Sequence, residues 1–428
     1  MEIILQEYET WPFTVEDKKI AKELKLQESD VELGNSLNEK GIIQFKQLNY
    51  TELEIKTNSY IGTVNFHSFK LTIIPKIYSK DNPEIWKNIA LCIYYVNDFD
   101  TAKFFELSKI KFENESQILQ DFIIMGFALE CENLIRHGLL KSYVNHQENL
   151  SFLRGKLILK NQFQNDISKN AKFFCEYDEL EYDNIENRII LDSLLISERL
   201  VQSESLKRKI FVLINQFSQL VSKTTITLYD IERIMSNYDR QNFRYFQIHT
   251  FCKLIKENSG ISDFYSQKIS YSIPFFVNMN EIFEKFVTKL FLDFFNSGTV
   301  YAQKTQKAWN IDDKGSIKIR PDIILKDSKN KSITIIDAKY KDRLYESDLY
   351  QIGFYIHEYR DPHYTGDEAY AILPKYYAEK SEKREYVATK SKIKIHARYL
   401  DVNHFIQKIY DDSFDRQNME LELDTILK

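Results

Sequence analysis

The residues of this chain best suited to chemistry are three charged side chains on two short apolar segments. The first segment, residues 319–325, contains Asp322, and the second, residues 335–340, contains Asp337 and Lys339. Each segment is an apolar run interrupted by charge, and the polar residues between them predict a β-hairpin. Two carboxylates and an ammonium group are costly to gather at one end of a sheet unless a divalent cation neutralises them.

The expected register of the hairpin brings the two carboxylates together. A symmetric four-residue connection at residues 328–331 pairs Asp327 with Ser332, and counting back from that pair sets Asp322 opposite Asp337. Directly opposed residues of an antiparallel pair have Cβ atoms roughly 4.5–5.5 Å apart. Lys339 follows Asp337 by two residues, so its side chain projects from the same face of the sheet.

Magnesium is the cation that fits such a set. It takes oxygen ligands, is usually held by one or two carboxylates and keeps several waters. A metal held in this way can activate a water molecule and stabilise charge on a transferring phosphoryl group. An adjacent lysine can orient the nucleophile or balance the charge of the scissile phosphate. The alternative interpretation is an exposed hairpin with a surface ion pair, because short patterns of Asp and Lys are frequent.

The motif Pro321-Asp322, followed by Asp337-Ala338-Lys339, resembles that of the PD-(D/E)xK nuclease superfamily. That superfamily usually carries a further acid on a helix before the hairpin. Residues 278–294 have helical periodicity and begin with a capping pair. Glu284 lies early in this segment, where it could reach the open end of the hairpin and complete a metal site with Asp322 and Asp337. The alternative is a solvated helix carboxylate.

The segment after the hairpin extends this resemblance. A helix is expected to start at Ser347, and the resemblance makes Gln351 a candidate for contacting DNA or the metal-bound water. Residues 369–373 form an apolar run that ends at Pro374 and predicts a strand. The resulting order of helix, strand, strand, helix and strand fits the nuclease core.

Further segments resemble a narrower family. They are residues 60–64, 71–77, 154–157, 175–180 and 186–190. Together with the nuclease motifs they resemble the McrC family, the PD-(D/E)xK nuclease subunits of McrBC-type modification-dependent restriction systems, over nearly the full length. The resemblance implies a type IV-like restriction endonuclease subunit for phage defence, cleaving double-stranded DNA that carries a modification such as 5-methylcytosine.

The same resemblance implies the cofactors and partners. Mg²⁺ is the expected metal, with Mn²⁺ as a substitute. The expected partner is a McrB-like hexameric AAA+ GTPase, which this chain would stimulate. GTP would be bound by the partner, since this chain has no GxxxxGK[ST] loop. The resemblance leaves open whether two copies of the chain associate to cut both strands.

Three alternatives accompany this interpretation. One is a McrC-like subunit of another restriction system with a similar GTPase. Another is a stand-alone repair or recombination nuclease with the same core. The third is a nuclease-silent adaptor that only activates the GTPase.

Composition and charge limit the class of protein. The chain has 428 residues, enough for two or three domains, and its four cysteines show no CxxC spacing. Acidic residues near the N-terminus and apolar runs too short to span a bilayer predict a cytoplasmic protein with no membrane contact. The net charge of −5 is unusual for a protein that holds DNA unaided. Either the nuclease face is locally basic, or a partner holds the DNA.

We expect an α+β multidomain chain. Residues 1–165 should form an N-terminal β-rich domain with helices that docks on the GTPase, and residues 166–265 a helical middle region. Residues 266–428 should form a C-terminal α/β PD-(D/E)xK restriction-endonuclease-like core. Residues 154–159 are expected to be a strand that returns to the first domain.

Overall fold

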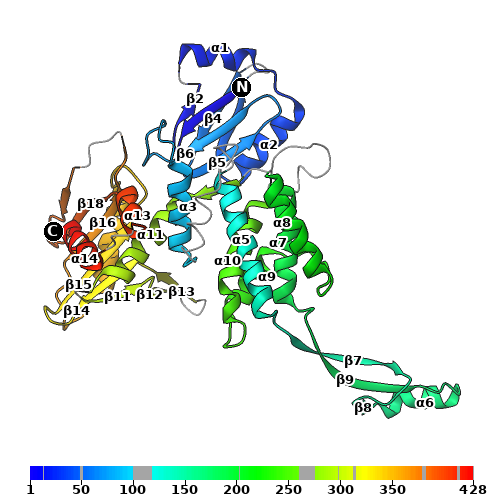
Figure 1. The fold of residues 1–428 in the computed structure, drawn as a ribbon. Helices are drawn as coiled ribbons and strands as arrows, with labels where there is room; N and C mark the ends of the chain where they lie inside the picture. Colours follow the sequence, from blue (N-terminus) through cyan, green and yellow to red (C-terminus); the bar gives the residue numbers. More distant parts are fainter. Residues whose placement is uncertain are drawn as a thin grey trace. The chain divides into compact units, whose positions relative to one another are not determined.

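The computed structural model describes residues 1–12, 14–48, 52–99, 118–201, 203–259, 275–296, 298–311, 315–377, 382–411 and 415–427 (Figure 1). The architecture is mixed α/β with several sheets. The chain divides into two compact units, and unit 1 comprises Met1–Thr101, Asn114–Leu119 and Pro274–Lys428. Unit 2 comprises Ala102–Glu113 and Gln120–Ile273. These limits differ from those of the three expected segments, and the expected boundary at 265/266 lies outside the described residues.

The N-terminal part of unit 1 contains two small sheets. One has the strand order β1-β6-β5-β10 and the other β2-β4-β3. The strands are β1 (Glu2–Gln6), β6 (Lys70–Ile74), β5 (Tyr60–Asn65), β10 (Phe275–Asn278), β2 (Thr10–Trp11), β4 (Glu52–Thr57) and β3 (Ile43–Leu48). Helices α1 (Val15–Glu23), α2 (Glu28–Glu39) and α3 (Ile85–Val96) accompany them. Because β10 pairs with β5, the start of the C-terminal region is part of the N-terminal sheet.

The C-terminal part of unit 1 is built on a six-stranded mixed sheet with the order β11-β14-β15-β16-β18-β17. Its strands are β11 (Thr299–Ala302), β14 (Ile323–Asp327), β15 (Ser332–Ala338), β16 (Glu368–Pro374), β18 (Lys394–Leu400) and β17 (Arg384–Val387). Strands β14 and β15 form the predicted antiparallel hairpin, and β16 runs parallel to β15. The expected strand at residues 369–373 is therefore confirmed.

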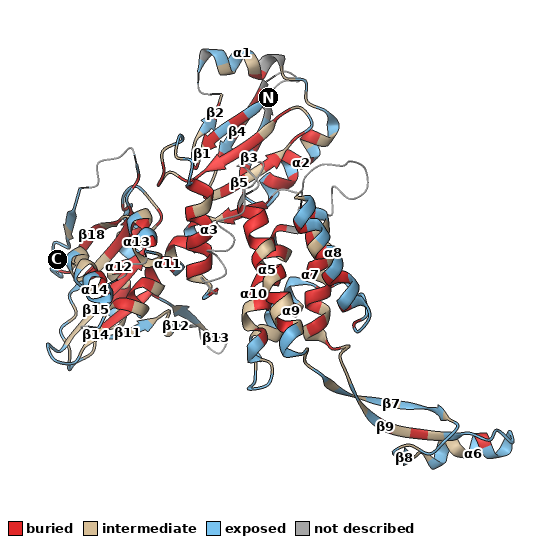
Figure 2. Cartoon of the chain, in the orientation of Figure 1, coloured by how far each residue is buried: buried red, intermediate tan, exposed pale blue. Residues whose placement is uncertain are grey.

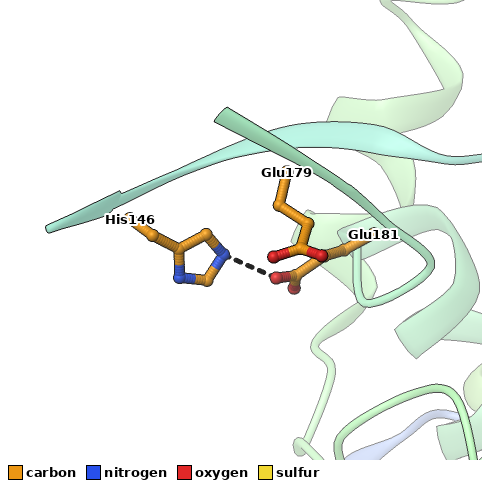
Figure 3. Close-up of side chains that lie close together, drawn as sticks. All are labelled: His146, Glu179 and Glu181. Carbon is orange, nitrogen blue, oxygen red and sulfur yellow. Dashed lines mark hydrogen bonds and ion pairs between the residues drawn. The ribbon is translucent and has the colours of Figure 1, made fainter. Parts of the chain in front are cut away.

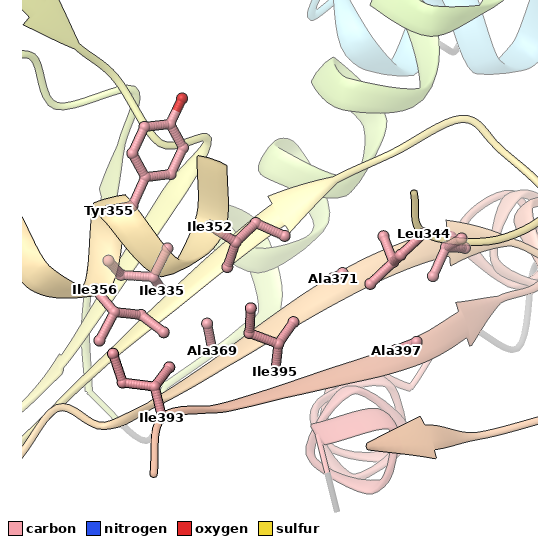
Figure 4. Packing of buried hydrophobic residues seen from close by; sticks show 11 residues of the cluster. Ile335, Leu344, Ile352, Tyr355, Ile356, Ala369, Ala371, Ile393, Ile395 and Ala397 are labelled. Carbon is pink, nitrogen blue, oxygen red and sulfur yellow. The ribbon is translucent and has the colours of Figure 1, made fainter. Parts of the chain in front are cut away.

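Helix α12 (Glu346–Glu358) connects β15 to β16 and packs on the sheet. Figure 4 shows the apolar side chains that hold it there, with Ile352 and Ile356 of the helix gathered beside Ile335 and Ile395 of the sheet. The remaining helices of this part are α11 (Met279–Phe294), α13 (Val402–Ile409) and α14 (Arg416–Leu427). A separate two-stranded ribbon, β12 (Gln306–Ile311) and β13 (Gly315–Ile319), precedes β14 in the chain.

Unit 2 is mainly helical but carries a long hairpin. Its helices are α5 (Ile118–His137), α6 (Leu159–Ile167), α7 (Ile185–Leu200), α8 (Glu204–Ser218), α9 (Leu228–Met235), η3 (Phe243–Tyr245) and α10 (Phe246–Ser259). Strands β7 (Ser142–Leu150), β8 (Lys156–Leu157) and β9 (Phe173–Glu181) form one sheet with β9 in the middle. Figure 2 shows β7 in exposed and intermediate colours and β9 with a short buried stretch, in contrast to the buried faces of α5 and α7.

The prediction that residues 154–159 return to the first domain is wrong. Lys156 and Leu157 pair with Glu176 and Cys175 of β9, so β8 closes a sheet within unit 2. The prediction failed because β7, the natural partner of β9, was not recognised from its mostly polar sequence. In the described part of the chain, no helix combines the length and apolar character that crossing a bilayer requires.

Candidate functional site

The β14–β15 hairpin has the register expected from the sequence. Asp327 pairs with Ser332 and Ile323 pairs with Ile336, so continuing the ladder by one residue sets Asp322 opposite Asp337. The Asp327 carboxylate stabilises the connecting turn by accepting hydrogen bonds from the backbone N–H groups of residues 329 and 330. This turn fixes the register, and a slip of one residue would send the two catalytic candidates to opposite faces.

The two carboxylates lie close together at the buried end of the hairpin. Asp322 is 8% exposed and Asp337 is 2% exposed. The backbone N–H of Ala338 donates to Asp322 Oδ2 at 2.7 Å, which ties Asp322 to the strand that carries Asp337. Asp337 Oδ2 is buried and makes no aligned hydrogen bond among the described residues, although a lysine ammonium lies beside it.

That ammonium belongs to Lys339, whose Nζ lies 2.7 Å from Asp337 Oδ2. The same Nζ donates to Gln351 Oε1 at 3.0 Å, and Gln351 Nε2 in turn donates to the Tyr355 hydroxyl at 2.8 Å. Gln351 and Tyr355 lie one turn apart on α12, so the helix after the hairpin orients the lysine. The backbone of Lys339 is fixed as well, because its N–H donates to the carbonyl of Ile372 in β16 at 2.8 Å.

Glu284 reaches the same cluster from α11. Its carboxylate lies close enough to Asp322 and Asp337 to raise the pKa of both. Gln303, next to β11, donates from Nε2 to Glu284 Oε1 at 3.1 Å. The structure therefore brings all five residues singled out in the sequence, Glu284, Asp322, Asp337, Lys339 and Gln351, to one place.

The electrostatics of the cluster follow from burying several acids together. Burial and the charges of Asp337 and Glu284 raise the pKa of Asp322 to about 8. Burial also raises the pKa of Asp337, although Lys339 opposes the shift. Burial opposes the charge on Lys339, yet the neighbouring carboxylates of Asp337, Asp322 and Asp348 together raise its pKa. Lys339 thus stays protonated, and its single positive charge faces Asp322, Asp337 and Glu284 together.

These features fit a divalent cation with oxygen ligands. A cation beside Asp322 and Asp337 would displace the proton that burial favours, and it would give the unsatisfied Asp337 Oδ2 a partner. Mg²⁺ is suited to such a site because it needs only one or two protein carboxylates. Asp322 and Asp337 would hold it, and Glu284 lies beside them, although no choice of one oxygen from each of the three brings all of them within 4.8 Å of one another.

Another buried acid, Glu7, binds the residue that follows Lys339, and it was not recognised in the sequence. Glu7, directly after β1, is fully buried, and its Oε2 accepts hydrogen bonds from the Tyr340 hydroxyl at 2.7 Å and the Lys76 backbone N–H at 3.1 Å. Burial raises the pKa of Glu7 to about 8. Tyr340 directly follows Lys339, and its ring packs on Phe283, which directly precedes Glu284. No local pattern marks Glu7, because its partner is 333 positions away.

Lys341 and Asp348 form another contact that the sequence interpretation missed. Lys341 Nζ donates to both oxygens of Asp348 at 2.7 and 3.0 Å. Asp348 also accepts from the backbone N–H of Tyr345, which caps the start of α12. The capping pattern before α12 was a signal that could have identified Asp348.

Unit 2 contains a different cluster, His146, Glu179 and Glu181, on the β7–β9 hairpin (Figure 3). Potential metal-ligand atoms of these residues lie within 4.8 Å of one another. However, His146 Nε2 lies 2.6 Å from Glu181 Oε1, and Glu179 Oε2 lies 3.1 Å from Arg154 Nη1. Because each carboxylate already has a cationic or hydrogen-bonding partner and all are partly exposed, we interpret the cluster as an ion-pair network.

The sequence and the fold are similar to those of known proteins. The sequence matches a family model described as "McrBC 5-methylcytosine restriction system component" over residues 55–367. No curated protein matches the chain significantly.

Two solved structures from Thermococcus gammatolerans are similar to the chain. One is described as "Refined half-complex from tetradecameric assembly of Thermococcus gammatolerans McrB AAA+ hexamers with bound McrC". It has 19% identity, a TM-score of 0.62 and coverage of 100% of both chains, which shows a shared fold. The other, described as a cryo-EM structure of the McrBC complex, has 19% identity and a TM-score of 0.48, covering 68% of this chain and 87% of that chain.

Proposed function

The chain belongs to the family of McrBC 5-methylcytosine restriction system components, and we propose that it is the McrC-type nuclease subunit of such a system. In this proposal it is a magnesium-dependent DNA endonuclease of the PD-(D/E)xK type. The observation that carries the proposal is the meeting of Asp322, Asp337 and Lys339 at the end of one hairpin, with Glu284 and Gln351 beside them.

Each residue has a role that follows from its position. Asp322, Asp337 and Glu284 hold the cation, and bound Mg²⁺ supplies a Lewis acid for phosphodiester hydrolysis. Lys339 keeps its positive charge and is 18% exposed, so it can stabilise negative charge that develops on the scissile phosphate. Gln351 holds the lysine in place through its side-chain oxygen.

The partner in this proposal is a McrB-like hexameric AAA+ GTPase that binds GTP and delivers modified DNA. The support is family membership and the fold shared with a chain of a structure whose description names McrB AAA+ hexamers with bound McrC. A partner that holds the DNA also accounts for the net charge of −5, which gives this chain little overall attraction for a polyanion.

The experiment is a cleavage assay with the purified partner, GTP, Mg²⁺ and DNA with or without 5-methylcytosine. We expect cleavage that requires all four components, with Mn²⁺ able to replace Mg²⁺. Asp337→Ala and Lys339→Ala should abolish cleavage while the complex still assembles and GTP is still hydrolysed. Substantial cleavage by either purified variant would contradict the assignment of these residues.

Two alternatives are separated by the same assay. A nuclease-silent adaptor would stimulate GTP hydrolysis but leave modified DNA intact in the presence of Mg²⁺. A stand-alone repair or recombination nuclease would cut without GTP and without the partner. The buried acids favour the nuclease over the adaptor, because they outnumber the one lysine beside them, and a protein with no need for a cation would gain stability by replacing them.

We further propose that the N-terminal region of unit 1 docks on the GTPase. Deleting residues 1–78 is an unsuitable test, because it removes β5, on which β10 pairs, and Glu7, which binds Tyr340. Ile4 on β1 is 48% exposed and offers a milder change. Ile4→Glu should reduce stimulation of GTP hydrolysis without affecting thermal stability, and unchanged stimulation would argue against docking through this strand.

A further inference from the structure

The two-stranded ribbon β12–β13 leads directly into the candidate metal site. It forms a sheet of its own, and in the described part of the chain its strands pair only with each other. Strand β13 ends at Ile319, three residues before Asp322. An extended chain covers at most about 3.6 Å per residue, so Lys318 lies within about 14 Å of Asp322. Whatever binds this ribbon is therefore close to the phosphate that would be cut.

The ribbon places like charges directly opposite one another. Lys307 pairs with Lys318 in the β12–β13 ladder. Lys304 precedes β12 and Arg320 follows β13, and all four side chains are exposed. Opposed like charges destabilise an antiparallel pair. None of the four forms an ion pair with a carboxylate among the residues that the structure describes, so the ribbon itself does not offset this repulsion.

An exposed aromatic side chain lies next to these charges. Trp309 pairs with Ile317, and they are 58% and 51% exposed. The Trp309 ring stacks on Phe354 of α12, with ring centroids 5.9 Å apart and an angle of 6° between the planes. Gln306 Nε2 also donates to the carbonyl of Glu358 at the end of α12, at 2.8 Å. The ribbon is thus held on the helix that carries Gln351, and its outer surface stays open.

We propose that β12–β13 is a DNA-contacting arm of the nuclease. Lys307 and Lys318, with Lys304 and Arg320, bind phosphates that flank the scissile one, and Trp309 packs against the sugar or base nearby. A two-stranded ribbon fits the major groove of B-DNA. A reach of about 14 Å corresponds to roughly four base pairs along the duplex axis, where phosphates follow one another every 3.4 Å on each strand. The bound polyanion also offsets the Lys307–Lys318 repulsion.

This inference rests on the proposed function and extends it to the way the substrate is held. Contacts of this kind go to the phosphate backbone, so they position the duplex without selecting its sequence. An acidic protein surface is the other partner that such a charge pattern could fit, and the experiment treats it as a contrary outcome.

Binding is measured by fluorescence anisotropy of a labelled 30-base-pair duplex at low salt, with the full chain in an Asp337→Asn background that prevents cutting. We expect Lys307→Gln combined with Lys318→Gln to weaken binding roughly tenfold and to lower the slope of log K against log salt by about 1.8. Arginine at both positions should preserve affinity. The matched control changes Lys329 and Lys390 to glutamine, because both are exposed and lie outside the ribbon; it should bind as the parent does.

Thermal unfolding provides the folding check. The glutamine pair removes a like-charge repulsion, so the variant should unfold no earlier than the parent. Weaker DNA binding then reports a lost contact and not a damaged ribbon.

Trp309 offers an independent signal. The other two tryptophans, Trp11 and Trp86, are 5% and 7% exposed, so DNA binding should change mainly the fluorescence of Trp309. Trp309→Phe should remove that change.

Three results would overturn the inference: no DNA binding by the parent chain, equal affinity and salt slope in the glutamine variant, or charge-dependent binding of an acidic polypeptide but not of DNA. The proposed function can fail separately. If the arm binds DNA as expected but the native chain with its partner does not cleave DNA in Mg²⁺, the inference about the arm is supported and the nuclease assignment is contradicted.

Discussion

The substitution Asp322→Asn should make the metal-free protein more stable while it removes metal binding. At pH 7 the folded protein favours a protonated Asp322, because burial and the neighbouring acids raise its pKa from the ordinary 3.8 to about 8. The unfolded chain releases this proton. Since pH 7 lies about 3 units above the ordinary pKa, the cost to the folded state reaches about 4 kcal/mol at about 1.4 kcal/mol per unit.

Asparagine does not carry this cost. Its side-chain oxygen can still accept from the Ala338 N–H, and its amide can donate to Asp337 or Glu284. Allowing for imperfect geometry, we expect a gain of about 2 kcal/mol in the free energy of unfolding, or roughly 2–4 °C in the thermal midpoint for a chain of this size. In the parent, Mg²⁺ at one hundred times its dissociation constant should add about 2.7 kcal/mol. The variant should not respond to Mg²⁺.

The assay is thermal unfolding of both proteins in EDTA and in excess Mg²⁺. Asp327→Asn is the control, because Asp327 lies at the other end of β14 and its pKa is lowered by hydrogen bonds from Asn330 and Lys329. That variant should lose stability and keep the full response to Mg²⁺. A parent that exceeds Asp322→Asn in stability without metal, or an equal Mg²⁺ response in both, would refute the reasoning.

Three further predictions concern parts of unit 1 around the site. In the folded protein Glu7 has a pKa of about 8, whereas in the unfolded chain its pKa is near 4.5. The free energy of unfolding should therefore fall as the pH rises between these values, by up to about 1.4 kcal/mol per pH unit. Glu7→Gln should flatten that slope in denaturant titrations at several pH values, and an unchanged slope would exclude Glu7 as its source. Gly62→Ala should destabilise the chain by more than about 1 kcal/mol in the same titrations, because Gly62 has φ of +148° and a Cβ there would lie 2.1 Å from the Phe275 carbonyl oxygen; an alanine variant as stable as the parent would contradict this. Gln351→Ala should lower kcat roughly tenfold with little change in KM, since it loses one hydrogen bond to the Lys339 ammonium, and an effect confined to KM would assign Gln351 to substrate binding.

The positions of the candidate site residues were easier to predict from the sequence than the fold around them. The hairpin register depends on a short turn and on alternating apolar residues, both of which are local, and the observed Asp327–Ser332 pair follows from them. The position of α12 follows from its apolar face and its capping residues. Once these elements are placed, the register of the hairpin fixes the positions of Asp322, Asp337 and Lys339.

Contacts between distant segments could not be predicted in this way. The hydrogen bond from Tyr340 to Glu7 joins the segment after β15 to the N-terminal sheet, and an isolated acid directly after β1 gives no sign of it. Strand β7 was missed for a different reason. None of its residues is buried and its sequence is mostly polar, so the alternation of apolar and polar residues that normally marks a strand is weak, and the pairing of Lys156 and Leu157 with β9 could not be anticipated.

The most direct test of the central claim is a titration of the full chain with Mn²⁺, followed by electron paramagnetic resonance, in the parent and in Asp337→Asn. We predict saturable binding of Mn²⁺ by the parent, competition by Mg²⁺, and loss of the bound fraction in the variant. Mn²⁺ binding that is the same in both proteins, or no bound fraction in the parent, would contradict a metal site at the end of this hairpin.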